Sequence, residues 1–206
     1  MPARLISIIG PPAVGKTTLA AALAAELPAG LIGEDFAGNP FLAASFTGRD
    51  ELMLPSQLYF LFSRVRQLFR RTWPKRGAFV SDYGFCQDRI YAEQRLAPAD
   101  LARYRDIAAT VADLVQPPDV MIHLDADVDE LGRRIAARGR DFERTIDEDF
   151  LARMRAAYEH VEAPPGCQWL RVDCARRDLR VAAERAELVE QVRSFLPQPE
   201  RRAPCR

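Results

Sequence analysis

Residues 10–18 read GPPAVGKTT and directly follow an apolar run, LISII, at residues 5–9. Glycines let a backbone wrap closely enough for its N–H groups to point at phosphate oxygens. The next residues, KTTLAAALAAEL, are good helix formers, and the N-terminus of a helix favours anions. A strand, a glycine loop and a helix in this order predict a nucleotide-binding P-loop of the pattern G-x-x-x-x-G-K-[ST], with the fixed positions at Gly10, Gly15, Lys16 and Thr17.

The residue types in this loop predict parts of the nucleotide site. In P-loops the lysine reaches the β- and γ-phosphates, and the serine or threonine hydroxyl ligates Mg²⁺. We therefore expect Lys16 to take part in catalysis and Thr17 to bind the metal. The loop and the first turn of the helix are expected to supply the contacts to ATP, from Gly10, Ala13, Val14, Gly15, Lys16, Thr17 and Thr18.

The composition is typical of a soluble globular protein. The chain has 206 residues, 48% of them hydrophobic and 28% charged, which suits one substantial domain. Lysine and arginine total 29, as do aspartate and glutamate, so the balance gives no support for a nucleic-acid partner. The four cysteines form no C-x-x-C pair, which favours reduced thiols. With no signal peptide and no membrane-length apolar run, we expect a cytoplasmic protein without a membrane partner.

Candidate strands alternate with candidate helices along the chain. Strands are expected at residues 4–9, 30–34, 78–81, 120–124 and 168–172. Helices are expected at residues 16–27, 40–47, 52–73, 84–95, 99–115, 127–138, 147–161 and 178–196. Pro74 should end the long helix at residues 52–73. The pattern predicts an α/β fold, a single P-loop NTPase domain over residues 1–196 with a parallel sheet of about five strands flanked by helices. The Pro-rich, charged tail at residues 197–206 is expected to be disordered.

Three carboxylates that follow candidate strands are candidates for catalysis and metal binding. Glu34 ends the second strand, at the edge where open α/β sheets bind ligands, and it could take a proton from an attacking hydroxyl. Its alternative roles are a helix cap or a solvated loop charge. Asp82 and Asp125 end the third and fourth strands, and either could assist Mg²⁺. Of the two, we favour Asp82.

An arginine-rich segment, RRIAARGRDFE, ends a candidate helix at residues 133–143. Its guanidinium groups could form a lid that closes over the γ-phosphate and neutralises charge during transfer. The alternative is a solvated basic helix face. Beside a P-loop we favour the lid, with Arg138 and Arg140 in catalysis and Arg134 in ATP binding.

The order of these motifs resembles that of the deoxyribonucleoside kinases, the family that includes deoxycytidine, deoxyguanosine and deoxyadenosine kinases. The resemblance runs from the P-loop to about Tyr158, most of the chain. It consists of the P-loop, a glutamate after the second strand, NPFL, PSQLYFLFSRVRQ, an acidic motif ending the third strand, RIAARGRDFE, and a helix ending in AAYE.

The resemblance implies roles for the residues around the acceptor. Glu34 resembles the family's general base for the 5′-hydroxyl. Gln57 resembles the glutamine that pairs with the base edge, and its amide offers both a donor and an acceptor. Arg64 and Asp88 are similar to an arginine–aspartate pair found beside the base in members that take deoxycytidine or deoxypurines. Glu143 resembles the lid carboxylate that holds the sugar 3′-hydroxyl.

Other residues around the acceptor agree with the family pattern or depart from it. The aromatic residues that could pack around the base are Phe36, Tyr59 and Phe60. The family usually has an acid-Arg-Ser triplet at the third strand, whereas this chain has Asp82-Tyr83-Gly84, and Arg89 is a possible substitute for the arginine. Phe46 aligns with a tyrosine that contacts the 3′-hydroxyl, so we place it in the substrate site without that hydrogen bond.

These observations predict a Mg²⁺- and ATP-dependent kinase acting on the 5′-hydroxyl of a deoxynucleoside. An arginine–aspartate pair beside the base would offer a hydrogen-bond acceptor to an exocyclic amino group of the base and would crowd a thymine methyl. Deoxycytidine or a deoxypurine should therefore be favoured over thymidine. The alternatives are a P-loop kinase of another small hydroxylated substrate and a nucleotide-binding regulatory protein. The guanine-reading motif N-K-x-D is absent, which weakens a GTPase interpretation. The resemblance also implies a homodimer.

Overall fold

The computed structural model describes residues 3–196, so the tail expected at residues 197–206 lies outside the described residues. The strands are β1 (Arg4–Ile9), β2 (Gly30–Ile32), β3 (Ala78–Ser81), β4 (Val120–Asp125) and β5 (Gln168–Asp173). They form one sheet in the order β2-β3-β1-β4-β5, and every neighbouring pair is parallel. The predicted α/β fold with a five-stranded parallel sheet is confirmed.

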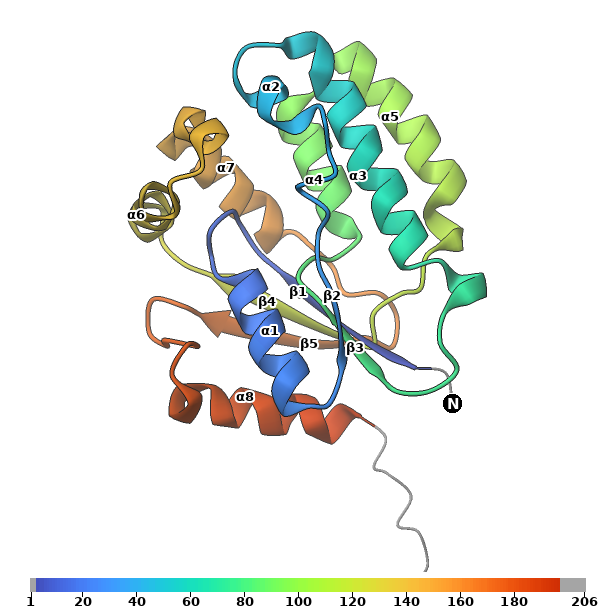
Figure 1. Ribbon diagram of the computed structural model, residues 1–206, viewed down its shortest axis with the longest axis vertical. Coiled ribbons are helices and arrows are strands. Elements are labelled where there is room, and N and C mark those ends of the chain that lie inside the picture. The colour runs from blue at the N-terminus through green and yellow to red at the C-terminus, as the bar shows by residue number, and fades with distance from the viewer. Residues whose placement is uncertain (1–2, 197–206) are drawn as a thin grey trace, which may run out of the picture.

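Helices cover both faces of this sheet. They are α1 (Lys16–Glu26), α2 (Leu42–Phe46), α3 (Met53–Gln67), α4 (Cys86–Arg95), α5 (Pro98–Val111), α6 (Val128–Arg138), α7 (Glu148–Glu159) and α8 (Ala182–Phe195). Figure 1 shows α1 and α8 on one side of the sheet and the group of α3, α4 and α5 on the other. Within residues 3–196, no helix has the length and apolar character needed to cross a membrane.

The sheet is buried from both sides because its strands are apolar at nearly every position. Ile6 and Ile8 pack in one cluster with Leu23 of α1 and Val192 of α8. On the other face, Ile9 packs with residues of α4 and α7. Successive strand residues point to opposite faces, so a continuous apolar run fits a sheet covered twice. Each fully buried isoleucine contributes about 2 kcal/mol of hydrophobic stabilisation.

The long helix predicted at residues 52–73 is shorter than expected, because α3 ends at Gln67. Leu68 caps the helix, and its carbonyl accepts a hydrogen bond from the Gln116 backbone N–H at 2.8 Å. Phe69 then adopts extended backbone and forms an isolated antiparallel bridge with Val115. This pairing with a distant segment overrides the helical spacing of the sequence, and Pro74 lies beyond the point where the helix stops.

Three other predicted bounds differ from the structure. The second strand ends at Ile32, which leaves Glu34 in the loop that follows. Helix α5 ends at Val111 and continues only as a short 3-10 turn. Helix α8 begins at Ala182, because Asp178 is held in a turn before it, where its carboxylate accepts a hydrogen bond from the Arg180 backbone N–H at 3.0 Å. The remaining elements lie close to their predicted positions.

Candidate active site

The phosphate-binding loop joins β1 to α1, and two of its glycines are required by the backbone. Gly10 has φ of 143°, and a Cβ placed on it would lie 2.3 Å from the Leu124 carbonyl oxygen. Gly15 has φ of 114° and caps α1, which begins at Lys16. Left-handed backbone and close approach of this kind favour glycine. The N-terminus of α1 is thereby presented at the end of the central strand, as the P-loop motif predicts.

Lys16 turns back onto its own loop. Its Nζ donates hydrogen bonds to the carbonyl oxygens of Gly10 at 2.7 Å and Pro11 at 2.9 Å. Burial lowers the pKa of Lys16 to about 7, an effect that Asp82 opposes and Arg138 reinforces. A bound phosphate would favour the charged form of this amine, because an opposite charge nearby stabilises it.

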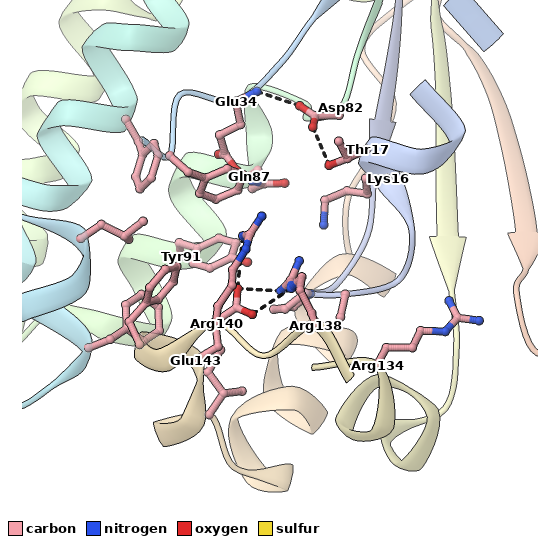
Figure 2. A pocket seen from close by; sticks show the side chains of 18 of the residues that line it. Lys16, Thr17, Glu34, Asp82, Gln87, Tyr91, Arg134, Arg138, Arg140 and Glu143 are labelled. Atoms are coloured by element: carbon pink, nitrogen blue, oxygen red, sulfur yellow. Dashed lines mark hydrogen bonds and ion pairs between the residues drawn. The ribbon is translucent and has the colours of Figure 1, made fainter. Parts of the chain in front are cut away.

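Asp82 lies between two loops of the site because β3 lies between β1 and β2 in the sheet. Its Oδ2 accepts a hydrogen bond from the Thr17 hydroxyl at 2.7 Å, and its Oδ1 accepts one from the Glu34 backbone N–H at 2.8 Å (Figure 2). Asp125, the competing candidate, instead accepts two hydrogen bonds from Arg155, at 2.7 and 2.8 Å. The structure therefore brings Asp82, and not Asp125, to the P-loop threonine.

Glu34 is held by side chains from two helices. Its Oε1 forms an ion pair with Arg64 of α3 and accepts a hydrogen bond from Gln87 Nε2 of α4 at 3.0 Å. Arg64 also pairs with Asp88, its Nη1 lying 2.5 Å from Oδ1. Burial raises the pKa of Asp88 to about 6, against the effect of Arg64. All of these side chains are buried, so Glu34 is neither a helix cap nor a solvated loop charge.

One cavity of about 270 Å³ joins the P-loop to the surroundings of Glu34. Sixteen of the predicted site residues line it: Ala13, Gly15, Lys16, Thr17, Thr18, Glu34, Phe36, Phe46, Gln57, Phe60, Arg64, Asp82, Arg134, Arg138, Arg140 and Glu143. Gly10, Val14 and Asp88 do not line it. Gly10 is packed against Leu124, and Asp88 is buried beside Arg64.

The end of the cavity away from the P-loop combines an amide with aromatic rings. Gln57 is 2% exposed, and none of the hydrogen bonds within residues 3–196 uses its carboxamide. Phe36 and Phe60 meet edge to face with ring centroids 5.8 Å apart. Tyr59 faces elsewhere, because its hydroxyl donates to Asp35 at 2.6 Å and its ring does not line the cavity. A flat ring with a polar edge would fit between these groups.

The arginine-rich segment reaches the cavity instead of forming a solvated helix face. Arg138 donates two hydrogen bonds to the Glu143 carboxylate, at 2.6 and 2.9 Å, and Arg140 lies 3.4 Å from the same group (Figure 2). Glu143 is 5% exposed and belongs to a 3-10 turn at Asp141–Thr145. Arg134 is fixed on the P-loop side by Glu130 at 2.6 Å and by the Val14 carbonyl at 2.8 Å.

A second cavity of about 390 Å³ adjoins the P-loop on its other side. It shares Ala13, Gly15, Thr18 and Arg134 with the first cavity, and Val14 lines it as well. Its remaining wall comes mainly from α6 and from the segment between β5 and α8. Residues of the P-loop therefore line two neighbouring cavities, which suits a nucleotide and an acceptor bound near each other.

Comparison with known proteins identifies the family. The sequence model described as deoxynucleoside kinase matches residues 6–197. The chain is 31% identical over 203 residues to a deoxyguanosine kinase of Bacillus subtilis, covering 91% of this chain and 98% of the relative. The chain belongs to the deoxynucleoside kinase family. It is therefore a kinase that phosphorylates nucleosides, as the order of its motifs predicts.

Two further proteins are similar to this chain, one in sequence and one in fold. A deoxyadenosine/deoxycytidine kinase of Bacillus subtilis is 27% identical over 164 residues, 76% of this chain and 75% of the relative. A solved structure of deoxyadenosine kinase from M. mycoides, with products dCMP and a flexible dCDP bound, superposes with a TM-score of 0.79 at 21% identity. It covers 93% of this chain and 100% of that chain, and it shows the same fold.

The departure from the deoxynucleoside kinase pattern at β3 has a structural explanation. Tyr83 is fully buried among Leu5, Leu68 and Val115, and its hydroxyl donates to Gln67 at 2.5 Å. It therefore adds nothing to the cavity wall. Arg89 does not replace the family's arginine either, because its side chain is 67% exposed and lies beside Glu93 at 4.0 Å. That suggestion from the sequence is wrong.

Phe46, where the family resemblance implies a tyrosine, packs between two cavity residues that the sequence did not predict. The Arg95 guanidinium stacks on its ring at 3.6 Å from the centroid, and the ring of Phe142 in the arginine-rich segment lies 5.7 Å away. The Thr145 hydroxyl also donates to the Phe46 carbonyl at 3.0 Å. Helix α2 thus contacts the 3-10 turn at Asp141–Thr145.

The sequence analysis missed several residues that line the cavity. They are Pro12, Leu42, Gln87, Tyr91, Arg95, Phe142 and Ile146. Gln87, Tyr91 and Arg95 recur on one side of α4 at helical spacing, four residues apart. That spacing predicts that the three residues lie on one side of the helix, but it does not predict which part of the protein that side contacts.

Proposed function

We propose that the enzyme transfers the γ-phosphoryl group of ATP to the 5′-hydroxyl of a deoxynucleoside and releases the 5′-monophosphate. One observation carries this proposal: Lys16 and Thr17 of the P-loop line the same cavity as Glu34 and Gln57. Donor phosphates and an acceptor hydroxyl bound there would be held close together, which removes much of the entropic barrier to the reaction.

The cavity residues divide between the two reactants. The P-loop amides and Lys16 would hold the donor phosphates, and Arg138 and Arg140 would neutralise the charge of the transferring group. Glu34 would accept the proton of the 5′-hydroxyl as the oxygen attacks, because it is the buried carboxylate at the boundary between the two halves. Glu143 would contact the 3′-hydroxyl once it is released from Arg138.

The residues at the P-loop also fit a magnesium ion. Mg²⁺ prefers oxygen ligands and is usually held by one or two protein groups together with substrate phosphates. The Thr17 hydroxyl and the Asp82 carboxylate provide such a pair, 2.7 Å apart at the cavity wall. When bound, the ion would neutralise charge on the donor phosphates.

We further propose a preference for deoxycytidine or a deoxypurine over thymidine. Gln57 would pair with the base edge, while the guanidinium of Arg64, fixed by Asp88, would donate hydrogen bonds to ring-nitrogen or carbonyl acceptors of the base and would crowd a thymine methyl. Asp88 lies outside the cavity wall, so its contribution would pass through Arg64. The relatives named as deoxyguanosine and deoxyadenosine/deoxycytidine kinases support this preference.

The test is a screen of the four deoxynucleosides and the ribonucleosides for ATP consumption, with the product identified by mass spectrometry. The expected result is a 5′-monophosphate of deoxycytidine or a deoxypurine at a higher kcat/KM than for thymidine. Preferred use of thymidine would overturn the base preference. Acceptance of no deoxynucleoside would overturn the proposed substrate class and leave another hydroxylated acceptor. A homodimer stays a prediction, which sedimentation analysis would check.

A further inference from the structure

Gln87 connects Glu34, the proposed base, to the interior of the protein. It lies in the first turn of α4 and is 2% exposed. Its Nε2 donates to Glu34 Oε1 at 3.0 Å, and its Oε1 accepts a hydrogen bond from the Tyr158 hydroxyl at 2.9 Å. Figure 2 shows Gln87 beside Glu34 at the wall of the cavity. Three side chains from a loop, α4 and α7 thus form one buried chain of hydrogen bonds.

The direction of these hydrogen bonds is fixed by Glu34, because a carboxylate only accepts and the Gln87 NH₂ must therefore face it. The side chain of Tyr158 is fully buried, and burial raises the pKa of the phenol well above its usual value, so the hydroxyl keeps its proton. That proton is donated to Gln87 Oε1, so the arrangement is consistent at both ends.

Two side chains contact Oε1 of Glu34, namely Gln87 through a hydrogen bond and Arg64 through an ion pair. Arg64 is shared with Asp88. Gln87 instead joins Glu34, in a loop after β2, to helices that pack on each other. A reacting group on a loop needs such support from rigid elements to keep a productive orientation.

We propose that Gln87, oriented by Tyr158, is a positioning residue for Glu34: its hydrogen bond to Oε1 holds the carboxylate in the orientation in which it accepts the proton of the acceptor hydroxyl. This inference rests on the proposed role of Glu34 as the base. Gln87 is neutral, so it can fix the carboxylate without adding a charge that would reduce its affinity for a proton. Gln87 would affect the rate of the chemical step through Glu34 and would contribute little to nucleoside binding.

The test is a double-mutant cycle between Gln87→Met and Glu34→Gln, with kcat and the acceptor KM measured for each variant. In the wild-type background, Gln87→Met should lower kcat about 10-fold to 100-fold, because misplacing a catalytic group by about 1 Å has effects of this size. The acceptor KM should stay within about twofold. In the Glu34→Gln background, the same substitution should cause no further loss of kcat, because its target is already disabled.

The two proposals fail in different ways in this cycle. Equal losses from Gln87→Met in both backgrounds, or an effect on KM alone, would overturn the positioning role and leave the proposed function standing. An unchanged kcat for Glu34→Gln by itself would overturn the role of Glu34 as the base.

Additional variants separate positioning from folding. Gln87→Met leaves the Tyr158 hydroxyl buried without an acceptor, which destabilises the protein, whereas removing both partners is nearly neutral. The double variant Gln87→Met, Tyr158→Phe should therefore fold and show the same loss of kcat as Gln87→Met. Tyr158→Phe alone should lower kcat roughly threefold to tenfold, the value of one hydrogen bond. The matched control is Tyr104→Phe, which removes a buried hydroxyl that has no partner within residues 3–196 and should leave kcat unchanged. Equal kcat for wild type and the double variant would overturn the proposal.

Discussion

The two ends of the cavity are built in different ways. The phosphate end is formed by one continuous loop, in which backbone conformation at Gly10 and Gly15 and the start of α1 do most of the shaping. The acceptor end is formed by single side chains from α2, α3, α4, the arginine-rich segment and the loop after β2. A backbone site changes little when side chains nearby are exchanged, whereas a site made of side chains can be altered one position at a time. The difference indicates where substrate selectivity can vary without loss of nucleotide binding.

The largest expected effect falls at the boundary between the two ends. Glu34→Gln should lower kcat by about 10²–10⁴-fold with a much smaller change in acceptor KM, because the amide is nearly isosteric but cannot take the proton. Steady-state kinetics and acceptor binding by calorimetry check this. The exposed Glu51→Gln is the matched control and should behave like wild type. A loss confined to acceptor affinity would assign Glu34 to binding.

A large effect is also expected at the phosphate end. Lys16→Ala should lower kcat roughly 10²- to 10³-fold by removing a cation from the donor phosphates, while the fold is kept. The chain has one other lysine, the exposed Lys75, so Lys75→Ala is a matched control. Turnover and ATP affinity are measured, with circular dichroism as the check on folding. A folded Lys16→Ala protein with normal turnover would contradict the P-loop assignment.

A smaller, selective effect is expected at the acceptor end. The double substitution Arg64→Met, Asp88→Ala should shift the ratio of kcat/KM for thymidine over deoxycytidine about 10-fold to 100-fold toward thymidine. Both charges leave together, so neither is buried without a partner. Because Arg64 also contacts Glu34, the rates for both substrates should fall, and the ratio is the informative quantity.

The control for this pair is Arg155→Met with Asp125→Ala, a bridged pair that does not line the cavity. In this control variant, the ratio of kcat/KM for thymidine over deoxycytidine should equal that of the wild type. If the Arg64/Asp88 variant loses stability without a change in ratio, the pair is structural and does not select the base.

The smallest expected effect concerns the pH dependence of ATP binding. Since the pKa of Lys16 is lowered to about 7 in the free enzyme and bound phosphates favour its charged form, binding above pH 7 should take up a proton. ATP affinity should then be nearly constant below pH 7 and weaken by up to about tenfold per pH unit above it. Calorimetry in buffers of different ionisation enthalpy measures the proton uptake, which Lys16→Met should abolish. Equal heats in all buffers at pH 8 would contradict the assignment.

The difference between a phosphate end built from one continuous loop and an acceptor end built from separate side chains also explains what could be predicted from the sequence. The P-loop is contiguous, so its motif was readable directly, and the alternation of elements was sufficient to predict the parallel sheet. The sequence favours Asp82 over Asp125 as the carboxylate that assists Mg²⁺, and the strand order explains why Asp82 is the one that lies beside Thr17. The roles of these residues stay predictions.

The residues that could not be predicted depend on contacts between distant segments. Gln87 meets Glu34 only because α4 packs against the end of the sheet, and Arg95 reaches Phe46 across a similar distance in the chain. The end of α3 at Gln67 has the same origin, since the bridge between Phe69 and Val115 is set by tertiary packing. Local periodicity does not contain this information.

The ion pairs of Glu143 with Arg138 and Arg140 have a thermodynamic consequence. In the proposed mechanism, a sugar hydroxyl bound to Glu143 would compete with the two guanidinium groups and release them toward the donor phosphates. Phosphates that attract the arginines would in turn release Glu143 for the sugar. The two substrates should therefore bind with positive cooperativity, each strengthening the affinity for the other by the same factor, as linkage requires. A nucleoside without a 3′-hydroxyl would bind more weakly and would also lose this mutual enhancement.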